Sequence, residues 1–290
     1  MGRITARRRV TRIRLGNEPV TRADVLAVEE PLEIRVGGRA LVVTMRTPGN
    51  DVELAQGFLV SEGVIGAADD LVTARYCAGT DAQGANTYNV LDLTLAPHVA
   101  PPDPSLERSF TTTSACGVCG KDSIDAVTTK SQHPVAGVGM RVDAEFLLSL
   151  PDRLRQGQKV FDKTGGLHAA GLFDANSGEL LVLREDVGRH NAVDKVIGWA
   201  LAAGLIPLHN AVLQVSGRAS FELVQKATMA GIPVLSAVSA PSSLAVDLAA
   251  EQGLTLAGFV RGESLVLYSR TDRILDSHAE SRAPVSESNQ

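Results

Sequence analysis

The sequence predicts an α/β protein with a smaller β-rich part on its N-terminal side. Between residues 31 and 95, short β-prone runs are separated by turn residues, whereas from residue 165 onward strand and helix patterns alternate. Such alternation implies a largely parallel sheet with helices on both faces. With 290 residues, of which 44% are hydrophobic and only 4% aromatic, the chain can bury a large aliphatic core as one domain or two.

The elements of the N-terminal part follow from its turn and cap residues. Gly37–Gly38 separates two β-rich runs, as expected for a hairpin with a tight primed turn. Asn50 or Asp51 is suited to cap a short helix, which Gly63 would end. The predicted elements are a hairpin over 31–46, a helix over 50–63 and strands over 71–77 and 87–95.

A proline-rich connector leads to the remaining elements. Four prolines between residues 96 and 105 predict an extended, semi-rigid segment. Helices are expected over 123–129 and 143–161, with Pro151 kinking or splitting the second. The alternating part then comprises strands over 167–173, 180–183, 211–215, 233–238, 254–260 and 265–268, and helices over 191–203, 221–230 and 244–251.

Charge and cysteine content indicate what the protein can bind and where in the cell it is located. The net charge is −5, and the first sixteen residues contribute +6 without any acid, so the remainder carries −11. An acidic body of this kind argues against a nucleic-acid binder, and the arginine-rich start is expected to be solvated and partly disordered. Only three cysteines favour a reducing, cytoplasmic location. There is no apolar signal-peptide core, and no apolar run approaches the roughly 18 residues of a membrane span.

These patterns divide the chain into five segments. The predicted boundaries are 1–29 for a basic N-terminal arm, 30–110 for a β-rich N-terminal domain, 111–121 for a mobile cysteine loop, 122–270 for an α/β domain and 271–290 for a polar tail.

The cysteine loop carries the most distinctive chemistry. Its sequence is T-T-T-S-A-C-G-V-C-G-K, and a glycine directly follows each of Cys116 and Cys119. Glycine and hydroxyl residues favour a flexible, wet segment, and Lys121 could lower a thiol pKa, so the loop suits a reactive thiol that must travel. Half of a zinc site and a dithiol oxidoreductase are the alternatives, although Cys77 is the only other cysteine.

Polar loops at the ends of the predicted strands indicate a ligand site, because parallel sheets bind ligands beyond the carboxyl ends of their strands. Arg189 and Arg218 suit bidentate phosphate contacts, and Glu185–Asp186 could accept hydrogen bonds from a guanine or sugar edge. His168 and His190 could equally be plain hydrogen-bonding groups. A phosphorylated or nucleotide-like ligand is therefore expected. The loops concerned are 164–168, 184–191, 216–220 and 239–243.

Six motifs in this order resemble the FdhD family of formate dehydrogenase accessory sulfurtransferases. The motifs are M-R-T-P-G-N-D-x-E-L-A-x-G-F-L, S-A-C-G-V-C-G, T-G-G-L-H-A-A, E-D-V-G-R-H-N-A-V-D-K, S-G-R-A-S-F-E and A-P-S-S-L-A-V, between Glu30 and Tyr268. The resemblance implies a homodimeric carrier that takes sulfur from a cysteine desulfurase as a cysteine persulfide. It would pass the sulfur to the molybdenum bis(molybdopterin guanine dinucleotide) cofactor, which formate dehydrogenase needs.

The resemblance also implies a cytidine deaminase-like α/β/α sandwich in the C-terminal half. Zinc deaminases need H-x-E followed by P-C-x-x-C, and this order is absent, so deamination and a bound metal are not expected. By the resemblance, Cys116 carries the persulfide and Cys119 assists or resolves it. A non-catalytic cofactor chaperone and a thiol-disulfide oxidoreductase remain alternatives. The expected cofactor-binding residues are His168, Asp186, Arg189, His190, Ser216, Arg218, Phe259, Val260, Arg261, Gly262, Glu263 and Ser264.

Overall fold

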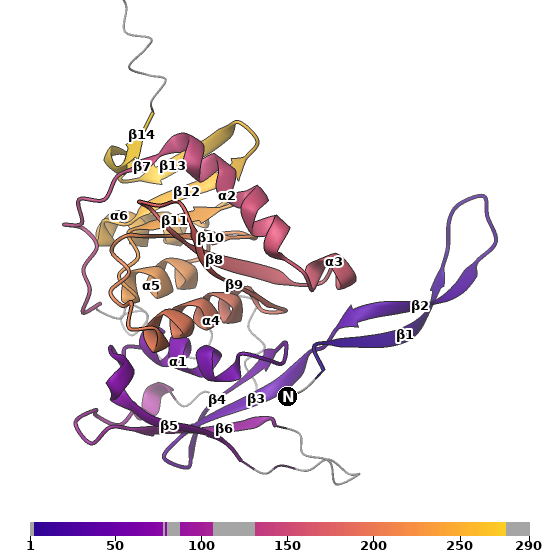
Figure 1. The fold of residues 1–290 in the computed structure, drawn as a ribbon, viewed down its shortest axis with the longest axis horizontal. Coiled ribbons are helices and arrows are strands. Elements are labelled where there is room, and N and C mark those ends of the chain that lie inside the picture. Colours follow the sequence, from indigo (N-terminus) through magenta and orange to yellow (C-terminus); the bar gives the residue numbers. More distant parts are fainter. Residues whose placement is uncertain (1–2, 78, 80–87, 107–130, 277–290) are drawn as a thin grey trace, which may run out of the picture.

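The computed structural model describes residues 3–77, 79, 88–106 and 131–276 (Figure 1). The predicted cysteine loop 111–121, the predicted helix 123–129 and most of the predicted tail lie outside these residues. A four-stranded and a six-stranded sheet, with helices between them, organise the described part. Over the same ranges, no helix is long and apolar enough to cross a membrane.

The four-stranded sheet confirms the predicted N-terminal elements. Its strands, in the spatial order β4-β3-β6-β5, are β3 (Glu30–Val36), β4 (Arg39–Arg46), β5 (Leu71–Tyr76) and β6 (Val90–Leu95). Gly37 and Gly38 have φ of 58° and 81°, and a type I′ turn requires two consecutive positive φ values. Helix α1 (Asp51–Ser61) has Asn50 as its N-cap and ends before Gly63, as predicted.

The six-stranded sheet is mixed, so the prediction of a largely parallel sheet is wrong. Only β10–β11 and β11–β12 pair in parallel, whereas β8–β9, β8–β10 and β12–β13 are antiparallel. The reason is that β8 lies between β9 and β10, which run in the same direction but are not neighbours. In spatial order the strands are β13 (Ser264–Ser269), β12 (Thr255–Arg261), β11 (Val234–Ala237), β10 (Ala211–Val215), β8 (His168–Asp174) and β9 (Leu180–Asp186).

Helices cover both faces of this sheet, as the alternation predicts (Figure 1). The face toward the N-terminal sheet packs against α4 (Arg189–Ala202), α5 (Phe221–Met229) and α6 (Ser243–Gln252). The other face packs against α2 (Ala144–Gly157), which Pro151 does not split. Buried Leu147, Leu150 and Leu154 hold α2 against the sheet on both sides of the proline, and a separate short helix, α3 (Phe161–Thr164), follows.

The first segment is ordered, so the prediction of a partly disordered arm is wrong for residues 5–27. Strands β1 (Thr5–Arg12) and β2 (Val20–Ala27) pair antiparallel along eight residues each, and their ribbon projects from the body (Figure 1). Arginines lie at both odd and even positions of β1. The apolar-polar alternation that signals a strand is therefore missing from the sequence.

The fold extends past residue 270, into the segment predicted as a polar tail. A 3-10 helix (Thr271–Arg273) and strand β14 (Ile274–Leu275) extend the fold, and β14 pairs in parallel with β7 (Val142–Asp143). Arg273 is 1% exposed, and its guanidinium donates hydrogen bonds to the carbonyl oxygens of Val135, Pro233 and Gly253. A charged arginine can be buried in a core when its guanidinium has this many hydrogen-bond partners.

Two further 3-10 helices are Ala68–Asp70 and Pro104–Leu106.

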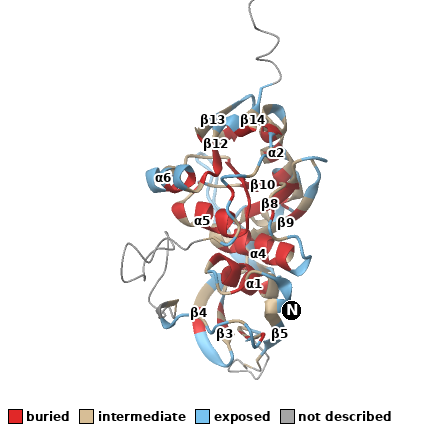
Figure 2. Cartoon of the chain, turned by 90° about the vertical axis from the view of Figure 1, so that its left-hand side faces the viewer, coloured by how far each residue is buried: buried red, intermediate tan, exposed pale blue. Residues whose placement is uncertain are grey.

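Helices α1 and α4 join the two sheets through a close crossing (Figure 2). A Cβ on Gly57 would overlap the carbonyl oxygen of Asp194, and a Cβ on Gly198 would overlap that of Glu53. The two backbones can therefore approach this closely only because both positions are glycine. The buried apolar residues around the crossing form one continuous core with both sheets.

Candidate functional site

The predicted ligand loops converge on one edge of the six-stranded sheet. His168 at the start of β8 is paired with Asp186 at the end of β9, and Val215 at the end of β10 is paired with Ala170. The carboxyl ends of β11 and β12 lie at the same edge because both strands run parallel to β10. Residues from four separate stretches of sequence are thus brought together at this edge.

Backbone contacts link these loops into a continuous rim. Ser216 accepts a hydrogen bond from the amide of Ala169 at its Oγ (2.9 Å) and donates its own amide to the Ala169 carbonyl (3.0 Å). The Gly217 carbonyl accepts from the amide of Ser239 (3.4 Å), and the Ser239 carbonyl accepts from Phe259 (3.3 Å). The imidazole of His168 lies over Gly217, where an added Cβ would be 3.5 Å from Nδ1.

Two histidines of this edge are held toward the neutral form. Burial and the nearby Arg189 guanidinium lower the pKa of His168, although Asp186 opposes the shift. Burial lowers the pKa of His190 to about 4, against the attraction of Glu222. The His190 Nε2 lies 3.1 Å from Ser220 Oγ and 3.5 Å from Glu222 Oε2. At neutral pH His190 therefore offers a hydrogen-bonding imidazole rather than a cation.

We expect His190 to make the protein less stable in mild acid. Its pKa falls from 6.5 in the unfolded chain to about 4 in the fold, so between these values only the unfolded state binds the proton. Stability is thus lost as the pH falls through this window, by about 2 kcal/mol at pH ~4.5. The free energy of unfolding in urea, measured at neutral pH and near pH 4.5, should fall less for His190→Gln than for the wild type. Equal losses in both proteins would contradict the buried, neutral state.

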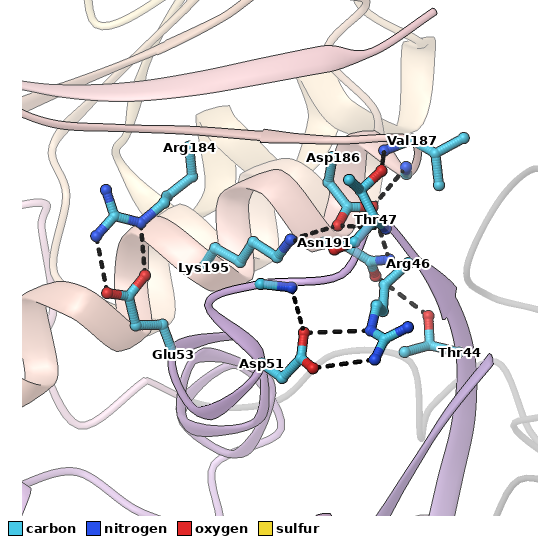
Figure 3. A network of polar contacts seen from close by, with 12 residues as sticks. Thr44, Arg46, Thr47, Asp51, Glu53, Arg184, Asp186, Val187, Asn191 and Lys195 are labelled. Atoms are coloured by element: carbon cyan, nitrogen blue, oxygen red, sulfur yellow. Dashed lines mark hydrogen bonds and ion pairs between the residues drawn. The ribbon is translucent and has the colours of Figure 1, made fainter. Parts of the chain in front are cut away.

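Asp186 lies behind the edge and organises it (Figure 3). Its side chain is fully buried, its Oδ2 is 2.7 Å from Lys195 Nζ, and Oδ2 also accepts from the Thr47 amide (3.1 Å). Its Oδ1 accepts from the Gly188 amide (2.8 Å) and from the amide side chain of Asn191 (3.1 Å). With both oxygens bonded inside the protein, Asp186 fixes the start of α4 and is closed to solvent.

The same network ties the edge to the N-terminal sheet. Lys195 donates to the Thr47 carbonyl (2.9 Å), and the Val187 amide donates to Thr47 Oγ1 (3.1 Å). Nearby, Arg184 on β9 forms a bidentate ion pair with Glu53 on α1, at 2.5 and 2.7 Å. Reasoning from the sequence did not single out Thr47 or Lys195, although both lie in motifs that carry the family resemblance. The contacts of Thr47 with Asp186 and Lys195 join residues more than 130 positions apart, which no local pattern reveals.

The remaining predicted residues differ in accessibility. Arg218 is exposed beyond β10, and Arg189 is the first residue of α4. In the hairpin joining β12 to β13, Phe259 is half-buried and Val260 fully buried, so Val260 serves the core. The guanidinium of Arg261 lies 6.0 Å from the centre of the Phe259 ring. Arg261, Gly262, Glu263 and Ser264 are exposed at the turn.

Two helices begin at this edge without a side-chain cap. Gly188, the N-cap of α4, has no side chain to supply one, and Ser220, the N-cap of α5, directs its hydroxyl to His190. By contrast, Ser242 caps α6 by accepting from the Ala245 amide. The first-turn amides of α4 and α5 thus suit an anionic ligand.

The described ranges contain no group of three or more His, Cys, Asp or Glu residues placed to hold a metal. Cys116 and Cys119 lie outside the described residues, and Cys77 is a half-buried free thiol.

Comparisons with known proteins agree over nearly the whole chain. The model of the FdhD/NarQ family matches residues 27–275. A Nocardia farcinica protein named sulfur carrier protein FdhD is 60% identical over 281 residues, covering 97% of this chain and 99% of its own. A Streptomyces avermitilis protein of the same name is 62% identical over 275 residues, covering 94% and 97%.

A solved structure supports the same relationship. The crystal structure of a candidate formate dehydrogenase accessory protein from Desulfotalea psychrophila superimposes with a TM-score of 0.74 at 25% sequence identity. The match covers 94% of this chain and all of the other. The sequence matches extend over both sheets and the candidate edge. The chain therefore belongs to the FdhD/NarQ family.

Proposed function

We propose that this protein is a sulfur carrier in the maturation of formate dehydrogenase. Cys116 accepts sulfur as a persulfide from a cysteine desulfurase, and Cys119 assists or resolves it. The sulfur then passes to the bis-guanine-dinucleotide form of the molybdenum cofactor, which is the substrate at the candidate edge. The relatives named sulfur carrier protein FdhD and the C-x-x-C loop support the sulfur-transfer part of this proposal.

One observation supports the choice of ligand. The uncapped N-termini of α4 and α5 lie at the same edge as Arg189 and Arg218. Backbone amides at a helix start and guanidinium groups both favour phosphate, so a ligand with several phosphates fits this edge. The neutral His168 and His190 add hydrogen bonds without increasing the positive charge. The exposed hairpin residues from Arg261 to Ser264 would contact the more distant part of such a ligand.

The length of the intervening chain allows the cysteines to reach this edge. The chain re-enters the described part at Ser131, whose hydroxyl donates to the Thr228 carbonyl (2.8 Å) near the C-terminal end of α5. The site lies at the other end of α5, a distance of about 14 Å for its nine residues. Eleven residues lie between Cys119 and Ser131, and a chain of this length spans at most roughly 40 Å when fully extended.

The family resemblance adds three further proposals. The C-terminal half has a cytidine deaminase-like fold, the protein acts as a homodimer, and it works in the cytoplasm. The mixed sheet covered by helices on both faces is compatible with the first, and the low cysteine content supports the third.

Intact and peptide mass spectrometry tests sulfur transfer directly. The purified protein is incubated with a cysteine desulfurase and cysteine, and we expect one added sulfur atom in a peptide that contains residues 116–119. Cys116→Ala should abolish this addition, because no thiolate remains at the accepting position. Cys119→Ala should still accept sulfur.

Cys77→Ala is the matched control, since Cys77 is a free thiol outside the loop, and this variant should load like the wild type. Loading that is lost only in Cys119→Ala would exchange the roles of the two loop cysteines. If neither the wild type nor any variant gains sulfur while the protein still binds guanine nucleotides, a non-catalytic cofactor chaperone becomes the better assignment for this protein.

A further inference from the structure

The β1–β2 ribbon is an element that the proposed function does not use. We call residues 3–28 the arm. It projects from the body, and among the described elements its base lies beside α3, which contacts β2, and beside the turn at Gly49, which Ile4 approaches (Figure 1). The FdhD/NarQ family model begins at residue 27, so it includes only the last two residues of the arm. The arm is thus an extension beyond the part of the chain that the family model matches.

The arm exposes several large apolar side chains. A two-stranded hairpin alone in water is only marginally stable, and a protein normally covers exposed apolar patches with a partner. Leu15 is 96% exposed and Ile13 is 73% exposed near the tip. Of fourteen large apolar residues exposed in the described part, five belong to the arm. They are Ile4, Ile13, Leu15, Val20 and Leu26.

Charge indicates what covers the arm. Seven arginines oppose only Glu18 and Asp24, so the arm carries +5, and a whole chain of −5 leaves −10 on the rest. One face of the ribbon presents Arg7 and Arg9 opposite Val25 and Ala23, without an acid. The complementary surface is therefore acidic, and the body of this same chain is acidic.

We propose that the arm docks on the body of a second copy of this chain, and that two copies exchange arms reciprocally. An arm that projects from its own body can contact the other body when a two-fold axis relates the copies. Such an isologous arrangement buries both arms and pairs each +5 arm with a −10 body. An unrelated acidic protein is the competing occupant, but no feature of the described residues specifies one.

The base of the arm is connected to the candidate edge, which gives the dimer a functional geometry. Glu185 at the end of β9 accepts hydrogen bonds from the amides of Val160 (2.9 Å) and Phe161 (2.8 Å) and so fixes α3 beside β2. A second copy seated on the arm would therefore lie near the edge that carries the proposed site. This inference rests on the proposed homodimer but not on sulfur transfer.

Sedimentation equilibrium of the full-length protein tests the arm. The wild type should be a dimer whose dissociation constant rises about tenfold or more between about 0.05 M and 0.5 M salt. Arg7→Glu with Arg9→Glu should weaken the dimer by roughly a hundredfold at low salt, because like charges would then meet. Arg7→Lys with Arg9→Lys keeps the charge and should stay within about threefold of the wild type.

Each other result would overturn the proposal. A monomeric wild type removes both the arm exchange and the dimer, whereas a dimer unaffected by the Glu replacements removes the arm exchange alone. An unchanged circular dichroism spectrum and intact sulfur loading show that the variants fold. If the wild type is a monomer by itself and forms a complex only with an added acidic protein, the arm would be assigned to that partner instead.

Discussion

Replacing Gly57 with alanine is expected to destabilise the protein by about 3 kcal/mol or more, although alanine normally stabilises a helix by about 1 kcal/mol over glycine. A methyl group at this position would overlap the backbone carbonyl of Asp194, which cannot rotate away as a side chain could. Helices α1 and α4 must then separate, and the core around Leu54 and Val193 loses its packing. Urea unfolding followed by circular dichroism would measure the loss.

The matching position on α4 provides a second test of the same contact. Gly198→Ala should be about as costly, because its Cβ would overlap the Glu53 carbonyl. The double variant should cost much less than the sum, since one separation of the helices relieves both overlaps. Gly139→Ala is the control, because nothing lies within 4 Å of an added Cβ there. A Gly57→Ala variant more stable than the wild type would show that the helices are not in such close contact.

Lys226→Met is expected to cost about 3–5 kcal/mol, because it leaves the carboxylate of Asp194 buried without its cation. The Lys226 Nζ lies 2.8 and 2.9 Å from the two Asp194 oxygens, and the side chains are only 2% and 4% exposed. Burial alone would lower the pKa of Lys226, but Asp194 and Glu222 raise it, so the lysine stays charged. Chemical unfolding at neutral pH would give the difference in free energy.

Two further variants separate this buried pair from an ordinary ion pair. Lys226→Met with Asp194→Leu should recover much of the loss, because the almost fully buried carboxylate of Asp194 is removed together with its cation. Asp162→Asn removes the partner of Arg155 in a pair that is about half exposed, and it should cost no more than about 1 kcal/mol. If Lys226→Met costs as little as Asp162→Asn, the pair is not an essential part of the core.

The sequence predicted those elements whose signals are local. The hairpin at Gly37–Gly38 needs two consecutive positive φ angles, and glycine supplies them, so the turn was visible without the structure. The helix after Asn50 was equally clear. The arm was not predicted as a hairpin, because β1 has arginine at both odd and even positions. Its sequence therefore lacks the apolar-polar alternation that identifies a strand. The neighbour relations of β8 were missed because strand order depends on contacts between distant segments.

The candidate edge was predicted only in part, because local signals locate its loops but not the contacts between distant segments. Glycine, hydroxyl and arginine residues at strand ends pointed to the loops that the structure brings together. Asp186 was expected to face the ligand, whereas its carboxylate is enclosed by Thr47, Asn191 and Lys195. A sequence shows that a carboxylate lies at a strand end, but not that Thr47, 139 positions away, and a lysine on the following helix enclose it. The roles of Cys116 and Cys119 rest on the motif and remain predictions.

The crossing of α1 and α4 also constrains how the chain can fold as it is synthesised. Gly57 leaves the ribosome about 140 residues before Gly198, which at 5–20 residues per second is a delay of roughly 7–28 s. During that interval the apolar face of α1, with Leu54, Phe58 and Leu59, lacks the helix that covers it in the native protein. We therefore expect the yield of the protein in cells to depend on chaperones that bind exposed apolar segments, more than its native stability suggests.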